Sequence, residues 1–204
     1  KVHGIIIQRP LPPSISAASL TKRVSLVKDV DGFCEKSPFH PPVACAVMHM
    51  LSEIYFRKIL GVQKPADDYS PEFIRWFKTK QVVLMGRGDI AGKPIANVLR
   101  KERIRFIQTN SSTDDPTEFT VKSDIIISAV GKPRVITANM IGEGAILIGV
   151  GLTKTNSGFS GDYDEAEIGE KAAFYTPTPG GISPVNVACL IRNVVTAAVH
   201  QTEK

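Results

Sequence analysis

The stretch QVVLMGRGDIAGKP, residues 81–94, decides the fold, because an apolar run passes directly into glycines and then into a helical pattern. A strand is expected over 81–86 and a helix over 92–102. The first N–H groups of such a helix are unpaired and its dipole favours an anion, so the stretch is typical of a phosphate site. Its spacing is G-x-G-x-x-x-G rather than the usual dinucleotide fingerprint. An ordinary tight turn that uses glycine for packing remains open at this point.

The rest of the chain after residue 80 alternates strands with helices. Further strands rich in Val, Ile or Leu are expected over 104–109, 124–130 and 145–151, and helices over 116–122, 137–142 and 183–200. Alternation of this kind indicates βαβ units and a parallel sheet. The predicted fold class is therefore α/β, with a Rossmann-like nucleotide-binding domain.

The first 60 residues differ in character from the rest. Residues 4–8 are a continuous apolar run, which fits a strand buried on both faces, and the prolines that follow stop it. Helices are expected over 16–27 and 43–60, the second closed by Gly61. The polar stretch QKPADDYS, residues 63–70, is the linker candidate. We expect one part over 1–60, a nucleotide-binding domain over 61–182, and a last helix, 183–204, that packs back on the first part.

Composition excludes several classes of protein. The 204 residues hold 25 Lys and Arg against 20 Asp and Glu, a net charge of +5 that is scattered along the chain. No stacking-aromatic or basic-helix module accompanies this charge, so no nucleic acid partner is expected. The apolar runs are too short to span a bilayer, and the start of the chain does not resemble a signal peptide. Three cysteines without a C-x-x-C pair argue against a disulfide framework and against a zinc cluster, so we expect no metal and a reducing compartment.

The end of the second strand bears on the choice of nucleotide. In NAD sites an acidic residue at this strand end holds the ribose hydroxyls, whereas here the strand ends QTNSS, residues 108–112. Arg87 and Ser111 are instead donors suited to a 2′-phosphate, which favours NADP. Asp114 and Asp115 lie close by in the sequence, so NAD stays open.

Several motifs occur in one order along the chain. They are GIIIQRPLP (4–12), KDVDGF (28–33), GRGDIAGKP (86–94), VGKP (130–133), GDYD (161–164) and TPTPGG (176–181). Together they resemble the bifunctional methylenetetrahydrofolate dehydrogenase/methenyltetrahydrofolate cyclohydrolase family, over essentially the whole chain. The resemblance implies a smaller folate-binding catalytic domain, of which residues 1–60 are a part, beside the NADP domain.

The resemblance also implies the residues of the site. Asp31 matches an acid that grips the pterin, since a carboxylate suits the adjacent N–H donors of an amino-pyrimidine, and Gln8 matches a glutamine beside the catalytic lysine. These two are the implied catalytic residues. The implied cofactor contacts are Gly86, Arg87, Gly88, Ile90, Gly92, Lys93, Pro94, Ser111, Val130, Gly131, Pro133 and Gly151. The implied substrate contacts are Gln8, Pro10, Asp31, Pro179, Gly180, Gly181 and Ile182. Taken alone, Asp31 in an Asp-Gly pair also fits a turn residue, and Gln8 a polar strand end.

The sequence departs from the family at several positions. The catalytic lysine of the family, in a Tyr-x-x-x-Lys motif, lies upstream of the position of Gln8, and no residue here takes its place. Gly88 stands where a serine is usual and Gly149 where an aspartate is usual, while residues 183–186 read SPVN instead of Gly-Pro-Met-Thr. The chain also begins at Lys1 rather than Met. Two explanations fit: a fragment of a longer chain, which we favour, or a degenerate relative that has lost the chemistry.

The function expected from the resemblance is oxidation of 5,10-methylenetetrahydrofolate with NADP, followed by hydrolysis of the methenyl product to 10-formyltetrahydrofolate. A mono-functional dehydrogenase and a non-catalytic nucleotide-binding relative remain the alternatives. The expected partners are the tetrahydrofolate substrate and a second copy in a homodimer, with no nucleic acid and no membrane. The expected location is cytoplasmic, and mitochondrial location stays open.

Overall fold

The computed structural model describes residues 2–9, 11–156 and 158–203. Its centre is a five-stranded parallel sheet in the order β2-β1-β3-β4-β7. The strands are β1 (Val82–Met85), β2 (Phe106–Thr109), β3 (Ile125–Ser128), β4 (Ile146–Gly149) and β7 (Phe174–Tyr175). A separate antiparallel hairpin pairs β5 (Leu152–Thr155) with β6 (Gly158–Gly161). The four strands expected after residue 80 and the α/β class are thus confirmed, with each strand shorter than its apolar run.

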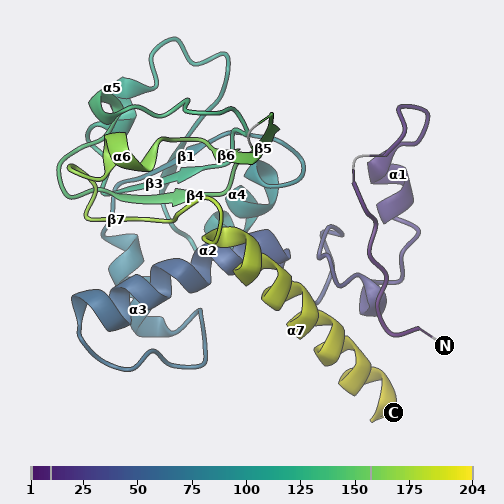
Figure 1. Cartoon of the computed structure of the whole chain (residues 1–204). Coiled ribbons are helices and arrows are strands. Elements are labelled where there is room, and N and C mark those ends of the chain that lie inside the picture. Colours follow the sequence, from purple (N-terminus) through teal and green to yellow (C-terminus); the bar gives the residue numbers. More distant parts are fainter. Residues whose placement is uncertain (1, 10, 157, 204) are drawn as a thin grey trace.

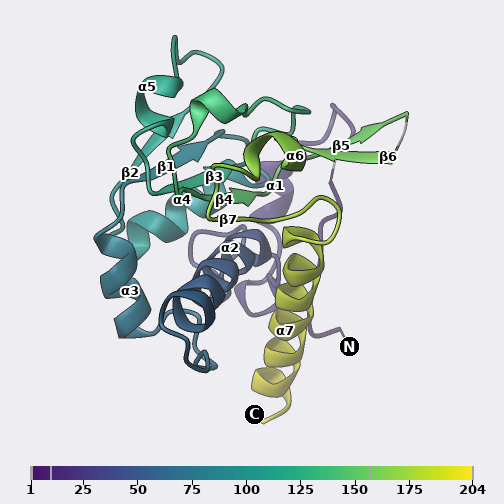
Figure 2. The same cartoon turned by 60° about the vertical axis from the view of Figure 1, so that its left-hand side comes forward.

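Helices cover both faces of the sheet (Figures 1 and 2). They are α1 (Ala17–Thr21), α2 (Pro42–Glu53), α3 (Pro71–Lys78), α4 (Gly92–Lys101), α5 (Thr117–Thr120), α6 (Glu165–Ile168) and α7 (Ile182–Thr202). Single turns of 3₁₀-helix form at η1 (Leu26–Lys28) and η3 (Ala138–Met140), and a π-helical turn, η2 (Ile54–Ile59), extends α2. The helix expected over 43–60 is confirmed as α2 plus η2, and Gly61, with φ +70°, ends it. The helix expected over 16–27 is wrong in extent, because it breaks into α1 and η1.

The core is divided by the sheet. Alternate strand residues such as Leu84 and Ile127 pack toward α2, α3 and α4, while Val83 and Ile126 pack toward Ile141 and the α6 side. The central strands β1, β3 and β4 are buried along their whole length, as expected for a parallel sheet covered on both faces. This packing fixes the carboxyl ends of the strands, where ligand sites of such sheets form.

The last helix connects the nucleotide-binding part to the N-terminal segment. In Figure 1 α7 runs from the sheet past α2 toward the segment that contains η1, and it contacts both. Its Asn193 side chain donates hydrogen bonds of 2.9 and 3.0 Å to the carbonyl oxygens of Val30 and His40. This helix is also long and apolar enough to span a bilayer by length and composition. The division at residue 60 stays a prediction.

The strand expected over residues 4–8 is wrong. Ile5 makes one isolated parallel bridge, to Asp29, and Ile6 is half exposed. The apolar run is strand-like in composition, but in the described part of the chain no neighbouring strand pairs with it. The prediction from composition fails here because a strand needs a neighbouring strand to pair with its N–H and C=O groups.

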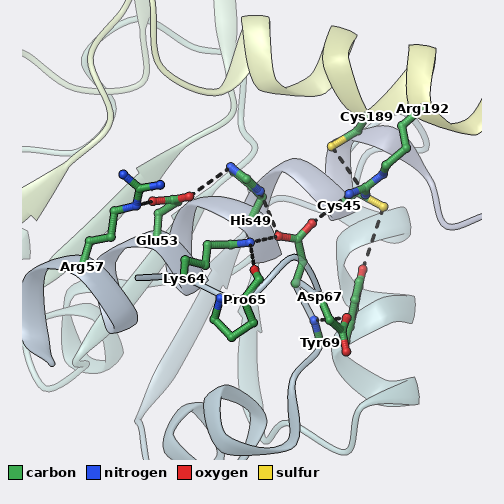
Figure 3. A network of polar contacts seen from close by, with 11 residues as sticks. Cys45, His49, Glu53, Arg57, Lys64, Pro65, Asp67, Tyr69, Cys189 and Arg192 are labelled. Atoms are coloured by element: carbon green, nitrogen blue, oxygen red, sulfur yellow. Dashed lines mark hydrogen bonds and ion pairs between the residues drawn. The ribbon is translucent and has the colours of Figure 1, made fainter. Parts of the chain in front are cut away.

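The linker candidate, residues 63–70, connects η2 to α3 and is held to the protein by a buried carboxylate, while its role as a boundary between two parts stays a prediction. Asp68, 3% exposed, accepts from His49 Nδ1 at 2.8 Å, from Lys64 Nζ at 2.8 Å and from Arg192 at 3.1 Å. Figure 3 shows these three side chains converging from α2, the segment itself and α7. Their hydrogen bonds hold the pKa of Asp68 well below its usual range, against the opposing effect of burial.

We expect Asp68→Asn to lower the free energy of unfolding by about 2–3 kcal/mol at pH 7, because Lys64 and Arg192 lose their counter-charge and His49 loses its contact with a carboxylate. Because the pKa of Asp68 is lower in the folded than in the unfolded protein, its ionised form stabilises the fold above the unfolded pKa of about 4. This stabilisation is lost as pH falls through and below that value. The variant should therefore lose less stability than the parent between pH 6 and 3, as measured by urea unfolding. Asp67→Asn, at an exposed neighbour, is the control; an equal loss in both variants would contradict the role of Asp68.

Candidate active site

The nucleotide hollow lies at the carboxyl edge of the sheet, where the strand order reverses. The chain passes from β1 to β2 on one side and then to β3 on the other, so the loops after β1 and β3 diverge there. A hollow of about 400 Å³ opens at this point. Its lining includes Gly86, Arg87, Gly88, Asn110, Ser111, Thr113, Val130 and Lys132. Five of the predicted cofactor contacts are thus brought together: Gly86, Arg87, Gly88, Ser111 and Val130.

Glycine is required in the loop after β1. Gly86 has φ +105°, a left-handed conformation, and a Cβ there would collide with the carbonyl oxygen of Ala129. A Cβ on Gly92 would meet the oxygen of Gly86 at 2.6 Å and the backbone of Arg87 at 2.8 Å. The loop therefore lies tight against the start of α4, whose N-cap residue, Ala91, makes no side-chain cap. At the start of α4 the N–H of Lys93 donates to the oxygen of Gly88 at 3.0 Å and Pro94 has no N–H, so the geometry favours the loop residues Arg87 and Gly88, which line the hollow, as the neighbours of a phosphate group.

The charges around this hollow suit an anion. Arg87 and Lys132 line it, and no Asp or Glu of the described chain does. The carboxylate of Asp115 is used locally, accepting from the N–H of Thr117 at 2.8 Å. The acids that left NAD open in the sequence are therefore not part of the hollow's lining.

A buried carboxylate that the sequence reading did not single out holds the loop after β3. Asp162, 1% exposed, accepts from Ser128 Oγ at 2.5 Å and from the N–H groups of Val130, Gly131 and Lys132 at 3.0, 2.9 and 3.1 Å. Three successive N–H donors aimed at one carboxylate fix the loop that forms one wall of the hollow. The GDYD motif, residues 161–164, contains this aspartate. Its role as the acceptor for the loop after β3 depends on β6 lying beside that loop, which the sequence did not predict.

A second hollow, of about 330 Å³, lies in the cleft between the N-terminal segment and the sheet. Gln8 and Asp31 line it together with Ile90 and Ile182. Asp31 Oδ2 accepts from the N–H of Ile7 at 3.1 Å, so the two matched motifs meet here. Burial raises the pKa of Asp31, the Ile7 hydrogen bond opposes the rise, and the nearby Asp29 adds to it. Gln8 is exposed, and its amide donates to the oxygen of Arg9 at 3.1 Å.

A smaller hollow of about 210 Å³ continues this cleft along the loop before α7. It includes Gly151 and the predicted substrate contacts Pro179, Gly180, Gly181 and Ile182. The two hollows share Val150, Ile182 and Ser183. Gly149, which stands where the family has an acid, faces Tyr163: a Cβ would lie 2.8 Å from its hydroxyl.

The remaining predicted contacts lie elsewhere. Lys93 and Pro94 line a different hollow, on the side of α1, and Gly92 is buried behind the loop. Gly131 and Pro133 line none of the hollows described here, and Pro10 lies outside the described residues. Sequence reasoning missed Arg9, Phe33, Ser183 and Asn186 in the cleft, whose neighbours come from distant segments. Among residues 2–9, 11–156 and 158–203, no group of three His, Cys, Asp or Glu side chains could hold a metal ion.

The parallel sheet, its switch point and the glycine loop define a Rossmann-type dinucleotide-binding protein with a second binding cleft beside the nucleotide hollow. Residues 74–202 match the family described as tetrahydrofolate dehydrogenase/cyclohydrolase, NAD(P)-binding domain. The chain is 35% identical over 199 residues to the bifunctional protein FolD of Halalkalibacterium halodurans, covering 97% of this chain and 67% of that protein. It is 32% identical over 214 residues to FolD of Campylobacter hominis, covering 100% and 69%. The chain belongs to the tetrahydrofolate dehydrogenase/cyclohydrolase family, as its motifs predicted.

Solved structures agree with this assignment. FolD of Campylobacter jejuni, a methylenetetrahydrofolate dehydrogenase/cyclohydrolase, superposes with a TM-score of 0.82 at 29% identity, over 98% of this chain and 68% of that one. The Trypanosoma brucei enzyme, solved with NADP and an inhibitor, gives 0.79 at 29% identity over 99% and 68%. The expected class of cofactor, a nicotinamide dinucleotide, is confirmed by the family. The chain spans about two thirds of the length of the relatives it matches.

Proposed function

We propose that the protein oxidises 5,10-methylenetetrahydrofolate with NADP and hydrolyses the resulting methenyl group to 10-formyltetrahydrofolate. The observation that carries the proposal is the pair of hollows: a glycine-lined nucleotide hollow and, beside it, a cleft that holds Gln8 and Asp31. When bound, NADP supplies the hydride acceptor. The loop that contains Gly86 and Gly88 would hold its phosphates, with Arg87 and Ser111 as donors to the 2′-phosphate.

The cleft residues have separable roles in this proposal. Asp31 receives the pterin N–H donors, which orients the folate, and the loop 179–182 forms the opposite wall. Ile90 and Ile182 give the cleft part of its apolar lining. In the described part of the chain no lysine lines the cleft, so the hydrolytic half of the proposal rests on family membership.

The test uses the full-length protein, NADP and methylenetetrahydrofolate, and follows NADPH and methenyl-folate absorbance together. NADPH formation with little methenyl-folate supports both activities. Methenyl-folate that accumulates as NADPH forms supports the mono-functional alternative. Binding of NADP without any binding of folate, in separate titrations, would overturn the proposal in favour of a non-catalytic relative.

We expect Asp31 to make folate binding depend on pH. The pterin donors favour the carboxylate, whereas burial raises the pKa of Asp31 in the free protein, so folate binding should weaken as pH falls through that raised pKa. Asp31→Asn should bind folate about tenfold to a hundredfold more weakly at pH 7 and lose this pH dependence. Folate titrations by calorimetry from pH 4 to 8 measure both effects.

Stability separates this binding role from a structural one. The pKa of Asp31 is raised in the folded protein, so ionising Asp31 lowers the stability of the parent once pH exceeds that pKa. Asp31→Asn carries no such charge and should therefore unfold at the parent's temperature or above it at pH 7. A variant that melts early, or that keeps the parental pH profile of folate binding, contradicts the assignment.

We also propose a homodimer in the cytoplasm that binds neither nucleic acid nor membrane. Three free cysteines support a reducing location, and the scattered charge gives no basic tract for nucleic acid. Sedimentation of the full-length protein tests the dimer directly.

A further inference from the structure

The loop 176–181 connects β7 to α7 and forms one wall of the smaller hollow beside the cleft. Pro179, Gly180 and Gly181 of this loop line that hollow. Two adjacent glycines leave the backbone many conformations to choose from, and Gly180 adopts a left-handed one, with φ +104°. Contacts with the rest of the protein must therefore fix where this wall stands.

Tyr163 supplies the first of these contacts, at the start of the loop. Its hydroxyl donates a hydrogen bond of 2.6 Å to the carbonyl oxygen of Thr176 and lies 3.1 Å from the Thr176 hydroxyl. The Thr176 hydroxyl accepts from the N–H of Gly149, at the end of β4, at 2.8 Å. Burial raises the pKa of Tyr163 to about 12, so its hydroxyl remains a hydrogen-bond donor at neutral pH.

The surroundings of the Tyr163 ring hold it in one place. The ring belongs to the buried cluster that contains Ile141 and Ile168, and the backbone of Tyr163 pairs with Ile136. A Cβ on Gly149 would lie 2.8 Å from the Tyr163 hydroxyl and 2.9 and 3.0 Å from two ring carbons. The ring therefore occupies the space that a side chain at position 149 would need. A close-packed ring keeps its hydroxyl at a fixed point below the loop.

Glu165 supplies a second contact, farther along the loop. The N–H of Thr178 donates to Glu165 Oε1 at 2.6 Å, a charge-assisted hydrogen bond. Glu165 is the first residue of α6 and follows Tyr163 by two positions in the chain. The segment after β6 therefore holds the loop at two points, one at Thr176 and one at Thr178.

We propose that Tyr163 is a positioning residue of the active site, which acts through Thr176 to hold the loop 176–181 against the cleft. This rests on the proposed function, because the place of the wall affects turnover only if the cleft binds folate. Tyr163 itself touches neither folate nor nucleotide in this assignment. It keeps the wall where folate is held in its reactive orientation, and a small shift of the wall lowers the rate.

The first test removes only the hydroxyl group. In the full-length protein Tyr163→Phe should lower kcat for methylenetetrahydrofolate oxidation about tenfold, since a displacement of about 1 Å can cost about a hundredfold. The Kd of NADP should stay unchanged, because the nucleotide hollow is formed by the loops after β1, β2 and β3. A purely structural role would lower the melting temperature and leave kcat as it is.

Tyr175→Phe is the matched control. It removes the same hydroxyl group one residue before Thr176, from a side chain that is partly exposed. In the part of the chain that the structure describes, no hydrogen bond engages this hydroxyl. Tyr175→Phe should therefore keep the parental kcat and the parental Kd of NADP.

Glu165 allows a test with a conservative variant. Glu165→Gln keeps an oxygen that can accept from the N–H of Thr178, whereas Glu165→Ala removes the acceptor. Glu165→Gln should therefore retain clearly more of the parental kcat than Glu165→Ala does. Equal losses in the two variants would contradict a hold on the loop through this hydrogen bond.

Hydrogen exchange reports on the loop without any need for catalysis. In the parent the N–H of Gly181 donates to the oxygen of Pro177 at 2.9 Å. The amides of residues 178–182 should exchange about tenfold faster in Tyr163→Phe, because the loop opens more often when its start is released. The amides of residues 86–92, in the loop after β1, should exchange as in the parent.

The two readouts separate this inference from the proposed function. Faster exchange in Tyr163→Phe, with no folate oxidation by the parent, would support the hold on the loop and overturn the proposed function. Folate oxidation by the parent, with kcat or loop exchange unchanged in Tyr163→Phe, would overturn the positioning role and leave the proposed function standing.

Discussion

Gly92→Ala should weaken NADP binding by about a hundredfold, close to 2.7 kcal/mol at 25 °C. The added methyl would lie 2.6 Å from the oxygen of Gly86 and 2.8 Å from the backbone of Arg87. Neither atom belongs to a flexible side chain, so the loop itself must move away from α4. That movement displaces Arg87 and Gly88, which line the nucleotide hollow. Fluorescence titration with NADPH measures the loss.

Gly142→Ala is the matched control for this result. A Cβ there would also collide with backbone, 2.6 Å from the oxygen of Val121, but Gly142 lines none of the hollows described here. Gly142→Ala should therefore lose stability yet keep its affinity for NADP. Equal losses of NADP affinity in the two variants would mean that any destabilising methyl weakens binding, and that the packing of the loop on α4 is not what matters.

Asp162→Ala should cost about 3–5 kcal/mol of unfolding free energy. The substitution leaves the N–H groups of Val130, Gly131 and Lys132 without their acceptor and frees the Ser128 hydroxyl, all around a site that is 1% exposed. Where the variant still folds, NADP affinity should fall as well, since Val130 and Lys132 line the nucleotide hollow. Chemical denaturation and NADPH titration give the two numbers.

Asp164→Ala is the control for the buried acid. Asp164 lies two residues away, is partly exposed, and caps the short helix α6 while pairing with the exposed Arg134 at 3.1 Å. Its loss should cost about 1 kcal/mol and leave NADP affinity unchanged. A cost for Asp162→Ala that is no larger than this would contradict the bracing role of Asp162.

The nucleotide-binding half could be predicted from the sequence because its signals are local. Each central strand is a short run of Val, Ile or Leu between polar turns, and the glycines after β1 report a tight approach that only a missing Cβ allows. The helix α4 begins at Gly92 as expected. Here composition, period and turn chemistry agree with one another.

The rest depends on contacts between distant segments. Residues 4–8 look like a strand by composition, yet strand formation is decided by neighbours that the run does not name. Asp68 sits in a polar stretch that resembles a linker, but its partners come from α2 and from α7, more than a hundred residues later. In the sequence Arg9 is one of several scattered cations, and the structure shows that its guanidinium lies over the ring of Phe33. Such roles are set by tertiary packing.

The cluster around Asp68 also constrains how the sequence can evolve. Replacing Asp68 first leaves Lys64 and Arg192 close together without a counter-charge, beside His49, and replacing these three residues first leaves a carboxylate that is 3% exposed without partners. Either order passes through a less stable intermediate. We therefore expect these four positions to be inherited as a unit, so that descendants keep all of them or carry neutral residues at all of them.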